Sequence, residues 1–227
     1  MGQERRSLKS MRRIFIDLEM NPVSNTFPDI KRILRSEIIQ IGAVVMEEDL
    51  SISGEFSKFV RPGYNDKIKK KITSLTGITT EMVREAGCLS DVLPEFLSWC
   101  GKEDYEICSW SESDIWQLMQ ELSAKKIPDY PGLSYMLNHW RDIQEDFRAA
   151  MQMDHMPSLK NAVYLADLDF EGMAHDALAD ARNTALLYKA SRDSEGYRRL
   201  KAASQDAMTP HTFTMGDMFD MSGIKLD

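Results

Sequence analysis

Three strand-like segments follow one another near the N-terminus, with no strong helical pattern between them. Residues 14–19 (IFIDLE), 37–46 (EIIQIGAVVM) and 51–61 (SISGEFSKFVR) are β-branched or alternate between apolar and polar residues, and the third stops at Pro62. Consecutive strands without a helix between them are typically neighbours in a sheet. The sequence therefore predicts an antiparallel meander at the start of the fold.

Helical patterns dominate the rest of the chain, apart from a short apolar strand expected at 106–110 (EICSW). The helices are expected at residues 79–87, 91–101 with Asp91 as N-cap, 113–126, 158–168 and 175–193. Residues 133–153 fit either one long helix or a last strand within HWRDIQ followed by a helix. Strands first, then strands mixed with helices, predict an α/β domain whose mixed sheet of about five strands carries helices on both faces.

One domain accounts for most of the 227 residues, a length that leaves room for one generous domain and an extension. We place the domain at residues 12–195. The Met-rich, aperiodic segment 196–227 is expected to be a flexible or loosely docked extension. The linker at 20–35 is long, contains Pro22 and Pro28, and is expected to be an insertion near the functional face.

The net charge of −8 comes from 28 Lys and Arg against 36 Asp and Glu. This balance argues against a protein that coats nucleic acid through a broad basic surface. It leaves open an enzyme that binds only a few nucleotides at one end. Clustered carboxylates that hold divalent cations would also make the charge negative.

The chain has three cysteines, Cys88, Cys100 and Cys108, and no C-x-x-C pair. An odd count without such a pair predicts free, buried thiols in a reducing compartment. No apolar run approaches the roughly 20 residues that cross a bilayer, and the N-terminus lacks the features of a secretory signal. We therefore expect a cytoplasmic protein without a membrane partner.

Two acids, Asp17 and Glu19, stand two residues apart on the first predicted strand, among apolar neighbours. Side chains at i and i+2 leave the same face of a strand, so the two carboxylates converge. Such a pair is costly to bury unless a cation neutralises it. Lys or Arg could do so, as could a hard divalent metal ion, and the pair by itself leaves both possibilities open.

Two later positions could add to this site. Asp114 follows the short strand at 106–110 and opens a helix, where Ser113 or Asp114 could equally be an ordinary N-cap. His175 and Asp180 are five residues apart and would point about 140° away from each other in a continuous helix. They can share a site only if His175 lies in the turn before the helix, and Asp176, on the same helix face as Asp180, is a rival ligand.

The order of these motifs resembles the DEDDh exonuclease superfamily, which includes oligoribonuclease, RNase T and the proofreading subunit of the replicative polymerase. The first motif reads IDLE, the second SWSESD and the third HDALADARNTA. The resemblance covers residues 12–192 and includes EIIQIGAVV, FSKFVRP, LTGIT and SLKNAV. It is closest to the KapD-like and histone-mRNA 3′-exonuclease-like branch, and it implies a ribonuclease H-like fold.

The resemblance also implies a mechanism. The metal ligands would be Asp17, Glu19, Asp114 and Asp180, holding two divalent cations, Mg²⁺ or Mn²⁺, with Asp17 bridging both. Two metals can stabilise the charge on an attacking water and on a leaving 3′-oxygen. His175 would be the general base, a task suited to a group that titrates near neutral pH. The expected activity is 3′–5′ hydrolysis of single-stranded RNA or DNA, releasing nucleoside 5′-monophosphates.

The resemblance also implies that Leu75, Thr76 and Gly77 line the slot for the terminal nucleotide and that Met20 contacts its base or sugar; plain packing is the alternative for Leu75 and Met20. Two other functions are weighed. A non-catalytic nucleic-acid-binding module on the same fold would need a missing ligand, and none is missing. An endonuclease of ribonuclease H-like architecture is disfavoured by the H-x-x-x-x-D motif. The sequence does not distinguish RNA from DNA, because that choice depends on a contact to the 2′-OH.

Overall fold

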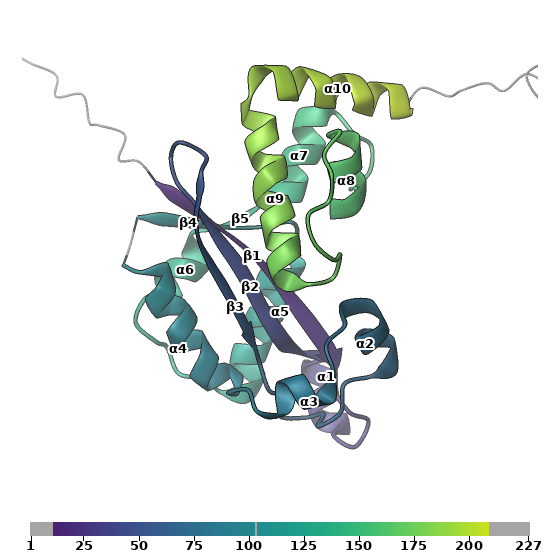
Figure 1. The fold of residues 1–227 in the computed structure, drawn as a ribbon. Coiled ribbons are helices and arrows are strands. Elements are labelled where there is room, and N and C mark those ends of the chain that lie inside the picture. The colour runs from purple at the N-terminus through teal and green to yellow at the C-terminus, as the bar shows by residue number, and fades with distance from the viewer. Residues whose placement is uncertain (1–10, 103, 209–227) are drawn as a thin grey trace, which may run out of the picture.

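A single mixed sheet of five strands organises the computed structural model, which describes residues 11–102 and 104–208 (Figure 1). The strands are β1 (Arg12–Pro22), β2 (Ser36–Met46), β3 (Ile52–Phe59), β4 (Tyr105–Ser109) and β5 (Trp140–Asp142). Their order in the sheet is β3-β2-β1-β4-β5. The pairs β1–β2 and β2–β3 are antiparallel, whereas β1–β4 and β4–β5 are parallel. The predicted meander and the predicted mixed sheet are both confirmed.

Helices connect and cover the strands. Within the described residues they are α1 (Pro28–Ile33), α2 (Lys70–Thr76), α3 (Thr80–Arg84), α4 (Leu89–Cys100), α5 (Ser113–Lys125), α6 (Leu133–Asn138), α7 (Ile143–Met151), α8 (Leu159–Leu165), α9 (Ala177–Arg192) and α10 (Ser194–Met208). α4, α5 and α6 lie on one face of the sheet, and α7, α8, α9 and α10 lie on the other (Figure 1). Helices on both faces were expected for an α/β domain.

The ambiguous region 133–153 follows the second of its two alternatives, because β5 separates α6 from α7. The linker at 20–35 contains the short helix α1, and α2 also lies where no helix was expected. Residues 194–208 form α10, which contacts α7, α8 and α9. The segment expected as an extension from residue 196 therefore begins inside a helix that packs on the domain. Residues 209–227 lie outside the described residues.

The expected N-cap of the helix at 91–101 is wrong. α4 begins at Leu89, so its N-cap is Cys88, and Asp91 occupies the third helical position. There the Asp91 carboxylate accepts a hydrogen bond from the backbone N–H of Cys88 at 3.0 Å. This is the returning half of a capping box, in which the acid three residues inside the helix satisfies the N-cap backbone.

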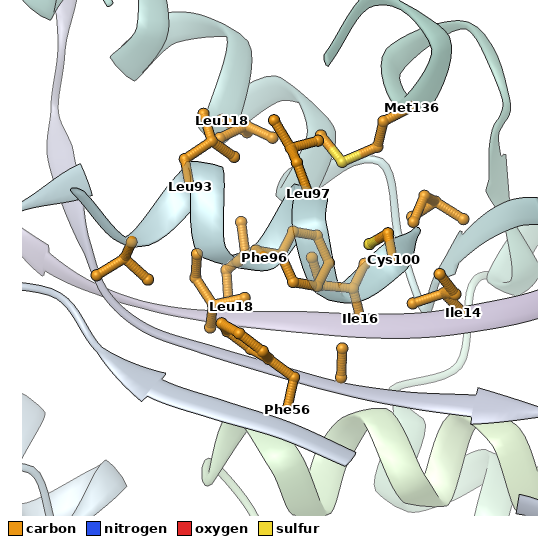
Figure 2. Close-up of a cluster of buried hydrophobic side chains, with 14 of the residues drawn as sticks. Ile14, Ile16, Leu18, Phe56, Leu93, Phe96, Leu97, Cys100, Leu118 and Met136 are labelled. Carbon is orange, nitrogen blue, oxygen red and sulfur yellow. The ribbon is translucent and has the colours of Figure 1, made fainter. Parts of the chain in front are cut away.

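Alternation along β1 divides its side chains between two cores. Ile14, Ile16 and Leu18 point into the core beneath α4, α5 and α6, where Phe96, Leu118 and Met136 meet them (Figure 2). Phe15 points the other way, into the core formed with α7, α8, α9 and α10. Because strand side chains alternate between faces, the odd-numbered residues of β1 belong to the α9 side of the sheet.

The three cysteines are free thiols, as predicted, although only Cys100 and Cys108 are buried and Cys88 is partly exposed. In the described part of the chain, no helix combines the length and the apolar character that crossing a membrane requires.

Candidate active site

Strand β1 presents Asp17 and Glu19 to the side of the sheet on which α9 lies. They follow the odd-numbered Phe15 along the strand, and the intervening Leu18 enters the opposite core. Asp17 is half-buried and Glu19 is buried. The pairing register with β2 shifts between Glu19 and Met20. Such a bulge re-aims the side chains beside it, and the pairing with β2 continues beyond it to Pro22.

Asp114 reaches this strand end from α5. The parallel pairing of β1 with β4 stops at Phe15 and Cys108. Beyond that point the backbone N–H of Leu18 donates to Asp114 Oδ1 at 3.1 Å. The N-cap of α5 is Glu112, so the alternative that Ser113 or Asp114 is the N-cap is wrong. The Asp114 side chain is only 4% exposed and is held against β1.

His175 lies in the turn before α9, which is the condition that lets it share a site with Asp180. α9 begins at Ala177, and its N-cap is Asp176. The backbone of His175 has a φ of +67°, in the left-handed region. Its N–H donates to Asp180 Oδ2 at 3.2 Å. His175 is exposed.

The rival ligand Asp176 is engaged as a cap. One oxygen accepts a hydrogen bond from the backbone N–H of Ala179 at 3.0 Å, and the other accepts one from Gln40 Nε2 at 3.2 Å. Both oxygens of Asp176 therefore have protein donors. Asp180 is different, because its Oδ1 is buried and has no hydrogen-bond partner among the described residues. The structure thus favours Asp180 over Asp176 as a ligand.

The side chains of Glu19, His175 and Asp180 converge, since one potential ligand atom from each lies within 4.8 Å of the others. Asp17 and Asp114 belong to the same electrostatic group. The pKa of Asp17 is raised well above its usual range by burial and then by the carboxylates of Asp114, Asp180 and Glu19. All five residues predicted from the sequence as catalytic or metal-binding are therefore brought together by the fold.

The pKa values of the other three carboxyl groups are also raised, chiefly by burial and further by neighbouring negative charges. Burial, followed by the charges of Asp180 and Asp114, raises the pKa of Glu19 to about 8. Burial raises the pKa of Asp114 to about 7, even though the N–H of Leu18 lowers it. Burial likewise raises the pKa of Asp180 to about 6. Four acids near one another, each resisting ionisation, form a site that lacks a positive charge.

The residues present fit a divalent cation. Within residues 11–102 and 104–208, no lysine or arginine forms an ion pair with any of the four carboxylates. The buried Oδ1 of Asp180 has no hydrogen-bond partner among the described residues and could accept a ligand. Buried carboxylates require a compensating charge. Hard cations such as Mg²⁺ and Mn²⁺ prefer oxygen ligands of this kind.

Three residues that the sequence did not single out position α9 and the loop before it. A Cβ on Gly42 of β2 would lie 2.1 Å from the carbonyl carbon of Ala177, so only glycine admits the start of α9 here. Gln40 Oε1 accepts the N–H of Ala177 at 3.2 Å. Asn183 donates to the carbonyls of Glu171 and Ala179, both at 2.8 Å, and anchors the loop that leads to His175.

Signals for two of these residues exist in the sequence. Gly42 interrupts an otherwise β-branched strand, and an isolated glycine in a strand often marks a close backbone approach. Gln40 is a polar residue in the same apolar run and is only 1% exposed. Asn183 inside a helix gives no comparable signal, because an exposed asparagine there would read the same.

The residues predicted to bind the terminal nucleotide differ in their exposure to solvent. Leu75 is 44% exposed at the end of α2, and an added Cβ on Gly77 would meet open space. Thr76 is buried, and its hydroxyl donates to the carbonyl of Ile72 and accepts from the N–H of Ile78, both at 3.0 Å. Met20 is partly buried against the core. Leu75 and Gly77 thus present the more accessible surface, and the slot stays a prediction.

Comparisons with known proteins point to a family of exonucleases. The RNase_T family, described as "Exonuclease", matches residues 14–188. Mouse ERI1 exoribonuclease 2 (Mus musculus) is 27% identical over 203 residues, covering 79% of this chain and 28% of that protein. Human 3'-5' exoribonuclease 1 (Homo sapiens) is 27% identical over 161 residues, covering 66% of this chain and 44% of that protein.

Among solved structures, the nuclease domain of 3'hExo, a DEDDh family member bound to rAMP, superposes with a TM-score of 0.68 at 21% identity. That match covers 81% of this chain and 92% of the solved chain. It supports the ribonuclease H-like architecture expected from the motifs. The chain spans less than half the length of the two curated relatives, so their activities as whole proteins do not transfer with the likeness.

Proposed function

This chain belongs to the RNase_T family of exonucleases, and we propose that it is a metal-dependent 3′–5′ exonuclease acting on single-stranded RNA. The observation that carries the proposal is the convergence of four carboxylates beside His175. Oδ1 of Asp180, one of the four carboxylates, is buried without a partner among the described residues, and no described lysine or arginine is ion-paired to the group. This arrangement supports the DEDDh pattern read from the sequence.

Asp17, Glu19, Asp114 and Asp180 would hold two divalent cations, Mg²⁺ or Mn²⁺. When bound, two such ions stabilise the negative charge that develops on an attacking water and on the leaving 3′-oxygen. The protein's own part is to place the four oxygen donors. β1 supplies two of them, and α5 and α9 supply one each. The raised pKa values of these carboxyls follow from burial without a counter-charge, which a cation would provide.

His175 would accept the proton of the attacking water. The water oxygen bonds to the phosphorus of the last phosphodiester, the bond from phosphorus to the 3′-oxygen of the preceding nucleotide breaks, and that 3′-oxygen takes a proton from solvent to become the new 3′-hydroxyl. The products are a nucleoside 5′-monophosphate and a strand shorter by one nucleotide. The position of His175 in an exposed turn, with a ring nitrogen near Glu19 and Asp180, supports this role.

The proposal of RNA as substrate rests on the curated relatives, whose names describe exoribonucleases. Single-stranded DNA is the alternative. The free thiols of the chain support a reducing compartment such as the cytoplasm.

The test is the digestion of matched 5′-labelled RNA and DNA strands with Mg²⁺, with Mn²⁺ and with excess EDTA. We expect a ladder of one-nucleotide steps from the RNA with either metal, and none with EDTA. Full activity in EDTA would exclude the metal site. Cleavage of an RNA whose 3′ end is blocked would indicate an endonuclease, and binding without cleavage in any metal would indicate the non-catalytic module. Preferred cleavage of DNA would reverse the substrate assignment and leave the reaction intact.

A further inference from the structure

Four lysines lie together just before and within the first turn of α2. Lys67, Lys69, Lys70 and Lys71, which we call the lysine cluster, are all exposed. Residues 61–78 contain five basic residues against one acid, Asp66, in a chain whose net charge is −8. None of the four ammonium groups forms an ion pair with a described residue. The cluster is thus a local positive surface on an acidic protein.

The backbone of the cluster is tied to the end of the strand that carries Asp17 and Glu19. Asn21 of β1 is fully buried, and its Nδ2 donates to the carbonyl of Lys67 at 3.2 Å. Its Oδ1 accepts the N–H of Lys69 at 3.0 Å. α2 accordingly contacts β1 (Figure 1). Asn21 is two residues beyond Glu19, so the backbone of the lysine cluster is held close to the strand end that follows the carboxylates.

Ile68, which lies between the lysines, fixes this segment to the core of the protein, and the lysine side chains are exposed. Ile68 is buried with Ile39, Ile78 and Val83 in a small apolar cluster. Its N–H donates to the hydroxyl of Thr80 at 3.0 Å. Apolar Ile68 therefore anchors the segment while the charged residues on either side of it face solvent. A merely solvated loop would not need a buried asparagine to fix its position.

The position of the lysine cluster near the carboxylates has an electrostatic consequence for a nucleic-acid substrate. Four carboxylates at one site repel a polyanion, and bound cations act only on the phosphate that reaches them. Phosphates of the preceding nucleotides need a separate source of positive charge. Lysine ammonium groups beside the site can supply it, since they contact phosphates as point charges without reading the base.

We propose that the lysine cluster binds the backbone phosphates of nucleotides upstream of the bond being cleaved, so that single strands are held in line with the carboxylate site. The inference rests on the proposed exonuclease function and adds to it where the rest of the strand lies. It assigns the cluster to a nucleic-acid backbone. An acidic protein surface is the competing occupant.

Substrate length provides the test. A dinucleotide has only the phosphate that is cleaved, whereas a 12-nucleotide strand has upstream phosphates as well. We would compare the wild-type chain with K70Q/K71Q and with K102Q/K160Q, a control that removes two exposed lysines from elsewhere on the surface. The value of kcat/KM would be measured for both substrates across a range of salt concentrations.

For K70Q/K71Q we expect kcat/KM on the longer strand to fall about tenfold or more near 0.1 M salt. We also expect the slope of log(kcat/KM) against log[salt] to become shallower by about 1.4, two contacts at roughly 0.7 each. Activity on the dinucleotide should be unchanged, and the control should match the wild type on both substrates.

Equal behaviour of K70Q/K71Q and the control on the longer strand would overturn the inference, as an acidic protein partner predicts. Loss of dinucleotide cleavage in K70Q/K71Q would also overturn it, because the lysines would then serve the terminal nucleotide or the fold. Both results differ from failure of the proposed function, in which the wild type cleaves neither substrate.

Discussion

The backbone N–H of His175 donates to one oxygen of Asp180 at 3.2 Å, while the other oxygen of that carboxylate is buried without a described partner. The turn before α9 thus orients Asp180 by one oxygen and leaves the second for another ligand. The same hydrogen bond places the imidazole beside the carboxylates.

The first prediction concerns Asp114, which is replaced by asparagine. Asparagine keeps an oxygen that can accept the N–H of Leu18, so the fold should survive with little change in melting temperature. It loses the negative charge that would hold a cation. Turnover should fall by at least about 10²-fold, a size typical of losing a group that stabilises transition-state charge. E112Q is the control, because Glu112 is an exposed acid in the same turn. Near-normal turnover in D114N would remove Asp114 from the site.

The second concerns His175. H175A should retain metal binding, measured by calorimetry, because all four carboxylates remain. Its rate at saturating metal should fall about 10²–10⁴-fold, the usual cost of removing a general base. The deficit should shrink as pH rises, since hydroxide then replaces the missing base.

The φ of +67° at His175 adds strain when alanine is introduced, so H175N is the companion variant. Asparagine tolerates that backbone region better than alanine does. H155A removes an exposed histidine elsewhere and should behave like the wild type. Parallel pH–rate curves of similar height for wild type and H175N would contradict the general-base role.

The third concerns the contact between β2 and α9. In G42A the added Cβ would lie 2.1 Å from backbone atoms of Ala177 and Leu178, so the start of α9 must move away from the sheet. The free energy of unfolding should fall by about 1–3 kcal/mol, as for other overpacked cores. Turnover should fall as well, because Asp180 moves with α9. G54A is the matched control, since its nearest contact would be an ordinary 3.8 Å. Equal activity in the two variants would show that α9 can shift without disturbing the site.

The fourth concerns pH and metal together. Without metal, the folded protein raises the pKa of Asp114 from 3.8 to about 7 and that of Glu19 from 4.5 to about 8. Between these values the folded state binds more protons than the unfolded state, so the free energy of unfolding falls as pH rises. The melting temperature in EDTA should therefore drop from pH 5 to pH 8.

Divalent metal should reverse this trend, because it binds the ionised carboxylates and stabilises the folded state. The increase in melting temperature with Mg²⁺ or Mn²⁺ should be larger at pH 8 than at pH 5. D17N removes one of the repelling charges, so its melting curve in EDTA should depend less on pH and should respond less to metal. A melting temperature in EDTA that rises toward pH 8 would contradict the assignment of these carboxyls as unneutralised.

Local periodicity made several features predictable. The alternation of β1 places Asp17 and Glu19 on one face whatever the rest of the chain does, because a strand has a two-residue period. The amphipathic pattern of residues 113–126 marks α5 for the same kind of reason. The short helices α1 and α2 were missed, since six or seven residues are too few to show a helical period.

The polar residues of α5 show a feature that sequence periodicity does not predict. Asp114, Gln117 and Glu121 are buried, although acids and amides in a helix usually indicate a solvated face. The buried carboxylate of Glu121 is compensated by two hydrogen bonds. Its Oε2 accepts the N–H of Ile38 at 2.7 Å, and its Oε1 accepts a hydrogen bond from Lys125 Nζ at 2.7 Å. Ile38 belongs to β2 and Lys125 to α5 itself. No residue near position 121 in the sequence indicates that this helix contacts β2.

The sequence by itself determined four of the five strands and most of the longer helices, because strand and helix periods are local properties, and the order of its acidic motifs indicated the chemical type of the site. Only the tertiary structure decided that Asp114 meets β1 across 96 residues of sequence and that Asp180, not Asp176, is left with a free oxygen. Both outcomes depend on packing between distant segments. The glycine at position 42 lets α9 approach β2, and hydrogen bonds from Gln40 and His175 then assign each carboxylate its partner.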